Sequence, residues 1–210
     1  FVTPTTVGFS YKPEKLWNLE AGVRARRLED RLRLSAAAYF TRSEDYQYYV
    51  GFAPSQYLSN VGEVKSKGAE ARLDWDVDSA WRIEARLAYN HARFTDYHNA
   101  TDPTADLTGN TLPYAPRWTG RAALTRRMAL PGTLGRLEIQ GGVTYSGRYW
   151  FEESNTLGQS AFVLYDARVS WRPKPELAID LYGENLGDKL YAPYGVALAP
   201  GVNVYQVAPS

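Results

Sequence analysis

Aromatic side chains and one arginine gather in a few short stretches of this chain. Phenol and indole rings stack on flat or apolar groups, and a guanidinium donates paired hydrogen bonds to anionic oxygens. Together they are suited to binding a bulky anionic ligand. The alternative is that most of these rings pack against one another or lie at an interface, where such side chains are common. The candidate residues are Tyr46, Tyr48, Tyr49, Tyr97, His98, Arg148, Tyr149 and Trp150.

No comparable set of residues predicts catalysis or metal binding. His91 and His98 are the only histidines, and neither GxSxG nor HExxH occurs. The chain has no cysteine, which excludes a thiolate nucleophile, a zinc–thiolate site and a disulfide scaffold. Gly141 and Gly142 lie inside a strand pattern and indicate close packing or a bend. We therefore expect no catalytic residue, no bound metal, no cofactor and no enzyme activity.

Net charge and hydropathy further narrow the classes of protein to which this chain could belong. The 24 basic and 23 acidic residues among 210 leave a net charge of +1, which argues against a nucleic-acid partner. The longest apolar runs, residues 36–40 and 161–165, are far shorter than the roughly 18 residues of a transmembrane helix. Two classes remain, a soluble all-β domain and a membrane β-barrel, whose alternating strands escape hydropathy averages.

Apolar and polar residues alternate with a period of two along most of the chain, which predicts β-strands. Leu32, Leu34, Ala36, Ala38 and Phe40, for example, share one face of a strand. Most of these strands are long for a globular protein and long enough to cross a membrane. About eight antiparallel strands are predicted, at residues 17–27, 31–41, 69–77, 81–89, 117–129, 136–145, 165–172 and 176–186.

The connections alternate between short and long, as in outer-membrane barrels with periplasmic turns and extracellular loops. The tight turns are expected at residues 28–30, 78–80, 130–135 and 173–175. The long loops are expected at residues 42–61, 95–116, 152–161 and 187–206.

Tryptophans avoid the middle of every predicted strand, which favours two interfacial girdles over the ends of a soluble core. Trp75, Trp81 and Trp171 lie near tight turns, and Trp17, Trp118 and Trp150 lie near long loops. The charged face of the strands fits a water-filled lumen with cross-strand ion pairs, and fits a solvated sheet face equally well.

The ordered set of motifs resembles the C-terminal barrel region of the TonB-dependent outer-membrane receptors. The resemblance covers nearly the whole chain. It rests on Tyr11-Lys12-Pro13-Glu14-Lys15, Asn60-Val61-Gly62, Leu112-Pro113, Tyr165-Asp166-Ala167-Arg168 and Asn185-Leu186-Gly187-Asp188. The family's plug domain, its TonB box and its final strand with an aromatic end have no counterpart here.

The resemblance implies that residues 1–210 are the C-terminal portion of a larger receptor barrel, an open fragment of about eight strands. It implies a Gram-negative outer-membrane receptor that takes up a metal chelate, a ferric siderophore foremost, with lipid, that ligand and the TonB complex as partners. Two alternatives stay open. One is a small structural or adhesion barrel, and the other is a soluble carbohydrate-binding β-domain.

Overall fold

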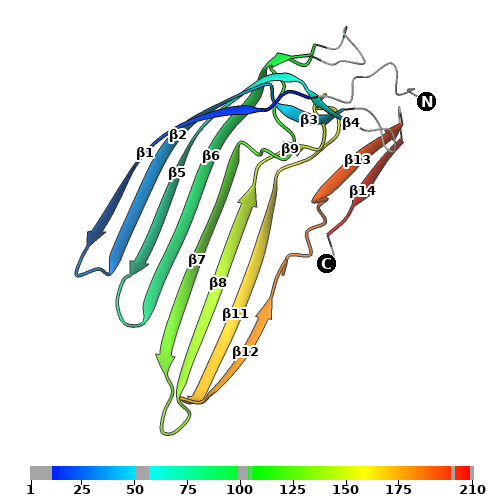
Figure 1. Cartoon of the computed structure of the whole chain (residues 1–210). Coiled ribbons are helices and arrows are strands. Elements are labelled where there is room, and N and C mark those ends of the chain that lie inside the picture. The colour runs from blue at the N-terminus through cyan, green and yellow to red at the C-terminus, as the bar shows by residue number, and fades with distance from the viewer. Residues whose placement is uncertain (1–10, 51–56, 99–103, 105, 200–201, 209–210) are drawn as a thin grey trace.

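The computed structural model describes residues 11–50, 57–98, 104, 106–199 and 202–208. Its main feature is one antiparallel sheet of eight long strands that pair in chain order (Figure 1). This confirms the predicted all-β class, strand number and pairing. The strands are β1 (Lys15–Arg27), β2 (Leu32–Glu44), β5 (Gly62–Asp76), β6 (Trp81–Tyr97), β7 (Trp118–Ala129), β8 (Arg136–Ser146), β11 (Phe162–Lys174) and β12 (Leu177–Gly183).

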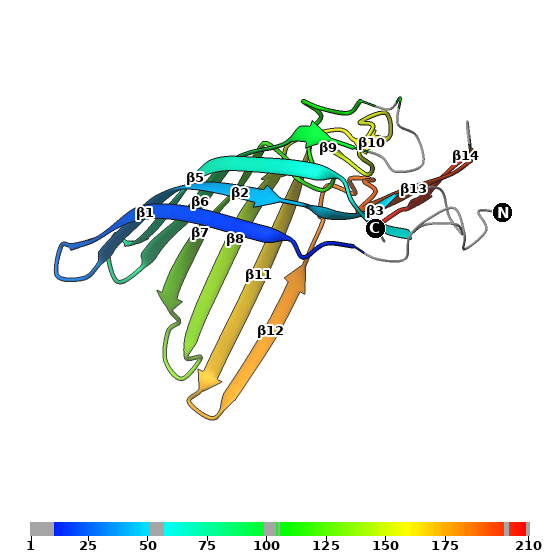
Figure 2. The ribbon, with the colours of Figure 1, turned by 45° about the horizontal axis from the view of Figure 1, so that its top comes forward.

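The sheet is curved and open (Figure 2), with β1 and β12 as its two edges. Within the described ranges no helix is long and apolar enough to cross a membrane. The terminal segments 1–10 and 209–210 lie outside the described residues.

The register gives the sheet one apolar and one charged face. Leu34 lies opposite Leu73, and on the other face Arg33 lies opposite Asp74. The apolar face stays uncovered by the described residues, since Leu19 is 65% and Leu181 is 74% exposed. A soluble sandwich would bury such a face, so its exposure argues against the soluble alternative and favours contact with lipid. We call the apolar face outward and the charged face inward.

Ion pairs cross the inward face from strand to strand, as the mixed charges of the sequence suggest. Asp74 accepts from Arg72 of the same strand at 2.5 Å and lies 3.4 Å from Arg82 on β6, which also contacts Asp76 on β5 at 3.3 Å. Arg127 continues the series, 3.2 Å from Asp76 and 3.2 Å from Glu138. Cross-strand pairing of opposite charges stabilises the register of the sheet.

One predicted close approach is confirmed at Gly142, which lies beneath a separate ion pair of Arg121 and Asp166 at 2.5 Å. A Cβ atom at Gly142 would lie 2.6 Å from the Asp166 carboxylate and 2.7 Å from the Arg121 guanidinium. Glycine leaves room for this pair. Gly141 differs, because a Cβ there would meet nothing within 4 Å.

Tight turns and long connections lie at opposite ends of the sheet, as predicted (Figure 1). At the turn end the chain passes through residues 28–31, 77–80, 130–135 and 175–176. The long connections at the other end, which we call the loop end, are not plain loops. They contain the hairpins β3 (Gln47–Val50) with β4 (Tyr57–Asn60), β9 (Tyr149–Trp150) with β10 (Gly158–Gln159), and β13 (Tyr194–Ala199) with β14 (Val202–Gln206). These hairpins were not predicted, because strands this short contain too few residues to show an alternation of apolar and polar side chains.

At the loop end several long strands extend beyond their predicted limits. β2 continues to Glu44, β5 starts at Gly62 instead of residue 69, and β6 continues to Tyr97. Hydropathy alternation stops there because charged side chains replace apolar ones on the outward face, while backbone pairing continues. β12 is shorter than predicted and ends at Gly183, because the chain turns at Asn185, where φ is 50°.

The tryptophans of the large sheet lie toward its two ends, and their place at the membrane interfaces stays a prediction. Trp118 pairs with Tyr89 toward the loop end, while Trp81 pairs with Arg126 at the turn end of the same strand. Trp171 reaches the turn that follows β7, where its indole nitrogen donates to the Leu134 carbonyl at 2.8 Å. A separation of about 25 Å between the two layers, the height of an apolar barrel band, stays a prediction.

Candidate ligand-binding surface

A first apolar cluster holds the loop end together above β5 and β6. Phe94 and Val61 are fully buried. The Phe94 ring packs edge to face against three tyrosine rings. Its centroid lies 6.3 Å from the ring centroids of Tyr46 and Tyr48 and 5.2 Å from that of Tyr97. Edge-to-face contacts of this kind add to the free energy gained from burial alone. The β3–β4 hairpin is thereby fixed against the end of β6.

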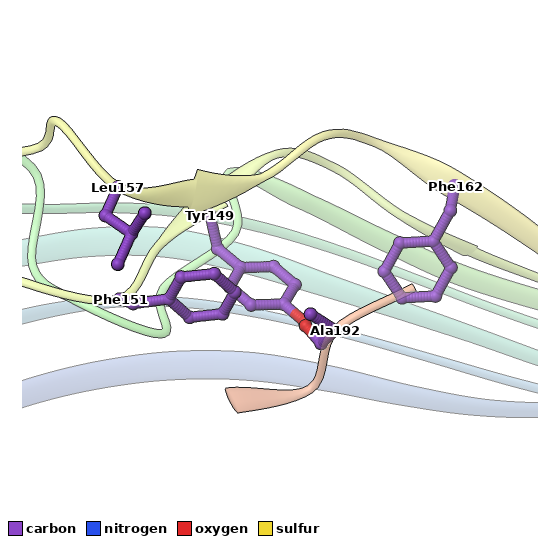
Figure 3. Close-up of a cluster of buried hydrophobic side chains, with 5 residues drawn as sticks. All are labelled: Tyr149, Phe151, Leu157, Phe162 and Ala192. Carbon is purple, nitrogen blue, oxygen red and sulfur yellow. The ribbon is translucent and has the colours of Figure 1, made fainter. Parts of the chain in front are cut away.

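A second cluster lies beside β9 and β11 and includes Tyr149, Phe151, Leu157, Phe162 and Ala192 (Figure 3). The Tyr149 hydroxyl donates to the Ala192 carbonyl at 2.8 Å, which joins the β9 hairpin to the segment before β13. A buried tyrosine needs such a partner because an unpaired hydroxyl in an apolar site is costly. The cluster connects residues 149–162 to Ala192, which lies 43 positions beyond Tyr149 in sequence.

Hydrogen bonds join the connection after β6 to the connection after β9. The Asn155 side chain accepts from the Thr111 amide at 2.7 Å and donates to the Thr111 carbonyl at 2.9 Å. The Tyr114 amide donates to the Trp150 carbonyl at 2.8 Å, and the Tyr114 ring stacks on Tyr194 with centroids 6.2 Å apart. We call the two clusters and the connections between them the loop layer.

The structure divides the eight predicted site residues into two groups. Tyr97 and Tyr149 are buried, and Tyr46 and Tyr48 are half-buried in the first cluster. These four build the loop layer. The remaining four reach solvent to different extents: Tyr49, His98 and Arg148 are exposed, and Trp150 is half-buried.

Arg148 and Trp150 form the best-defined exposed pair. The Arg148 guanidinium carbon lies over the Trp150 ring, 5.5 Å from its centroid, within the range of a cation–π contact. Tyr149, between them, anchors the backbone to the second cluster. The pair places a cation and an indole ring side by side at the start of β9. His98 is engaged differently, with Nε2 3.1 Å from the Asp96 carboxylate.

Two residues important to this surface were missed by the sequence analysis. Phe94 was overlooked because it lies beyond residue 89, where the predicted strand ended. Asn155 was overlooked because nothing in a lone asparagine reveals its partner, Thr111, more than forty residues away in sequence. Within the described residues, no group of three or more His, Cys, Asp or Glu side chains is placed to hold a metal ion.

Burial changes the acid–base behaviour of two groups in the loop layer. Burial raises the pKa of Tyr48, so its hydroxyl stays protonated and can donate. Burial also raises the pKa of Glu153 above its ordinary value of 4.5, and the neighbouring Glu152 adds to the rise. The Tyr48 hydroxyl hydrogen-bonds to Glu153 and opposes the rise in part.

Glu153 is therefore expected to make the loop layer more stable in acid. A carboxyl whose pKa is raised by folding contributes stability below its unfolded pKa, and this contribution is lost as the pH rises through the folded value. Amide hydrogen exchange of Phe151 and Asn155, which donate to backbone carbonyls, corrected for intrinsic rates, should show more protection at about pH 4 than at about pH 7.5. Glu153→Gln should remove the dependence, and an unchanged dependence in that variant would exclude this group as its source.

The long antiparallel strands, the open edges and the uncovered apolar face define this chain as β-barrel wall of the outer-membrane type. A family model for the "TonB dependent receptor-like, beta-barrel" matches residues 2–186. The chain belongs to the TonB-dependent receptor family.

Curated relatives and solved structures agree with this membership. The pesticin receptor of Yersinia pestis is 27% identical over 197 residues, which cover 90% of this chain and 27% of that protein. The probable TonB-dependent siderophore receptor PiuA of Acinetobacter baumannii is 28% identical over 185 residues, 85% of this chain and 24% of that protein. The chain thus spans about a quarter of the length of these relatives.

The structural likeness is closer than the sequence identity suggests. The ferric yersiniabactin uptake receptor FyuA of Yersinia pestis superposes with a TM-score of 0.78 at 25% identity, over 93% of this chain and 28% of that one. The siderophore receptor PiuA of Acinetobacter baumannii gives a TM-score of 0.75 at 25% identity, over 94% of this chain and 27% of that one.

Proposed function

We propose that this chain, residues 1–210, is the C-terminal portion of the barrel of an outer-membrane receptor. The complete receptor takes up a metal chelate, a ferric siderophore foremost, with energy delivered by the TonB complex through parts outside this chain. The observation that carries the proposal is the loop layer, which holds an arginine and exposed aromatic rings in fixed positions at one end of the barrel. The siderophore receptors among the relatives supply the ligand class.

The open edges favour a portion of a larger barrel over a complete small one. β1 and β12 are not paired with each other among the described residues. Unpaired backbone groups are not tolerated in lipid, so other strands must complete the wall. We assign Trp17, Trp75, Trp81, Trp118, Trp150 and Trp171 to the two membrane interfaces, with the loop end extracellular.

Within the candidate site we assign direct ligand contact to Tyr49, His98, Arg148 and Trp150, which reach solvent. Tyr46, Tyr48, Tyr97 and Tyr149 act as positioning residues that hold the layer. Arg148 offers a forked donor to carboxylate or catecholate oxygens, and the Trp150 ring offers flat apolar contact.

Replacing Arg148 with alanine in the full-length receptor should weaken capture of the ferric chelate by roughly 10- to 150-fold, the loss of one charge-assisted hydrogen bond. Equilibrium binding of the iron-loaded ligand measures this effect. Arg172→Ala is the matched control, because Arg172 lies in β11 near the turn end. Wild-type affinity in Arg148→Ala together with a loss in Arg172→Ala would reverse the orientation that we assign to the barrel.

A further inference from the structure

Four arginines lie on neighbouring strands of the inward face, between the loop end and the turn end: Arg24, Arg72, Arg86 and Arg121. We call them the inner arginine row. Arg72 on β5 lies directly opposite Arg86, and Arg86 on β6 lies directly opposite Arg121 on β7. Ser35 on β2 separates Arg72 from Arg24 on β1. Like charges at opposed positions of an antiparallel pair repel, so pairing of the strands gains nothing from this row.

Carboxylates balance only part of the charge of the row. Asp74 accepts two hydrogen bonds from Arg72. Asp166 accepts two from Arg121. Arg86, between these two pairs, is exposed and has no ion pair among the described residues. Residues that break a rule of stability in this way are expected where a site serves a function.

A depression of about 830 Å³ on the inward face adjoins the unbalanced charge, and its volume is typical of a small-molecule site. Arg86 lines one side of it, and Arg24, which is also exposed and without an ion pair among the described residues, lines the other. The two backbones are three strand spacings apart, at most about 14 Å. The space between them is open because Ser35 is small and Arg72 is held toward the turn end by Asp74.

The charge of the lining changes sign along the depression. Glu20 and Glu70 lie on its loop-end side, and Arg24 and Arg86 lie closer to the turn end. An anion that enters from the loop end is repelled by the carboxylates and attracted by the arginines beyond them. This order of charges fits an anion that moves from the loop end toward the turn end.

We propose that Arg24 and Arg86 form an anion-binding site on the barrel wall, which holds carboxylate or catecholate oxygens of the chelate during its passage toward the turn end. A guanidinium donates paired hydrogen bonds to such oxygens. The inference rests on the proposed function, but it concerns the transport step and not capture. Arg86 lies eight residues before Phe94 on β6, about 27 Å along the strand from the loop layer.

Modification by phenylglyoxal, which attacks accessible guanidinium groups, tests the site in the full-length receptor in neutral detergent. Mass spectrometry gives the rate at each arginine. Ferric citrate, an anionic chelate with carboxylate oxygens, should slow modification of Arg24 and Arg86 about 10-fold at ten times the dissociation constant. Uncharged ferric tris(acetohydroxamate) should protect neither. Arg26 is the internal control, because it is exposed on the same face of β1 and does not line the depression.

Variants of Arg24 test whether the two arginines act on one anion. Arg24→Gln should weaken ferric citrate binding about 10-fold, the loss of one charge-assisted donor, so that protection of Arg86 falls to about 2-fold at the same concentration. Arg24→Lys should keep most of the protection, which separates loss of charge from a folding defect. Arg26→Gln is the matched control and should leave the protection of Arg86 unchanged.

Equal protection of Arg86 in the wild type and in Arg24→Gln would overturn the proposal. So would an Arg86 that resists phenylglyoxal before any chelate is added, because an acidic group from another part of the receptor would then occupy the site. Arg86→Gln should also slow uptake of radioactive iron by cells that depend on this receptor about 5-fold, with unchanged capture affinity.

The two readouts separate this inference from the proposed function. Absence of protection in a receptor that imports iron sinks the inference alone. Protection of Arg24 and Arg86 in a wild-type receptor that imports no ferric chelate keeps the anion-binding site and sinks the proposed function alone.

Discussion

Replacing Phe94 with alanine should destabilise the loop layer by about 3–5 kcal/mol, the usual cost of truncating a fully buried phenylalanine. Phe94 has no solvent exposure and contacts the rings of Tyr46, Tyr48 and Tyr97. Its removal leaves a cavity at the point where β3–β4 meets β6. The layer would then open more often, and because Arg148 and Trp150 depend on the same layer, chelate affinity should fall as well.

Amide hydrogen exchange of the full-length receptor measures this opening directly. The Val61 amide donates to the Tyr46 carbonyl at 2.9 Å and the Phe94 amide donates to the Asn110 carbonyl at 3.0 Å, so both should exchange faster in the variant. Phe40→Ala is the matched control, since Phe40 lies on the outward face and is 42% exposed. If the backbone amides at positions 61 and 94 kept their wild-type protection in Phe94→Ala, the first cluster could not be what holds the loop layer together.

Replacing Asp74 with alanine should cost the barrel about 1.5–3 kcal/mol of unfolding free energy, because it removes a buried carboxylate that accepts charge-assisted hydrogen bonds from Arg72 and Arg82. Asp74 is 7% exposed and accepts two hydrogen bonds from Arg72, at 2.5 and 3.0 Å. Arg82 also approaches it at 3.4 Å. Without this carboxylate, the guanidinium groups of Arg72 on β5 and Arg82 on β6 would have less negative charge between them to offset their repulsion.

The measurement is urea unfolding of the full-length barrel in lipid vesicles. Glu70→Ala is the control: Glu70 lies on the same face of β5, is exposed and has no ion pair among the described residues. It should change stability by less than about 0.5 kcal/mol. Equal losses in the two variants would mean that inward carboxylates act through total charge and not through specific pairs.

The membrane-spanning part of the fold follows from the sequence to a large degree. Alternation is a local property, so Leu34 and Leu73 can each be assigned to a face without knowledge of the partner strand. Sequential pairing then follows from tight turns such as residues 28–31, which leave a strand no neighbour other than the next one. The positions of the tryptophans relative to these turns follow as well.

The loop layer is different, because its contacts join residues far apart in sequence. The sequence offers Arg148, Tyr149 and Trp150 equally as ligand-binding candidates. In the structure Tyr149 is buried and bonded to Ala192, so it anchors the backbone, while Arg148 is exposed. The alignment of Arg42, Lys65 and Arg93 on neighbouring strands likewise follows only from the register of the sheet.

The eight long strands, their two faces and the family can thus be recognised from the sequence, since each depends on a period or motif read within a few residues. Tertiary structure decided which aromatic rings support the binding surface and which remain free to contact a ligand. The physical reason is that burial and hydrogen bonding at the loop end come from partners dozens of residues away, such as Asn155 and Thr111. Those partners are set by packing and not by local pattern.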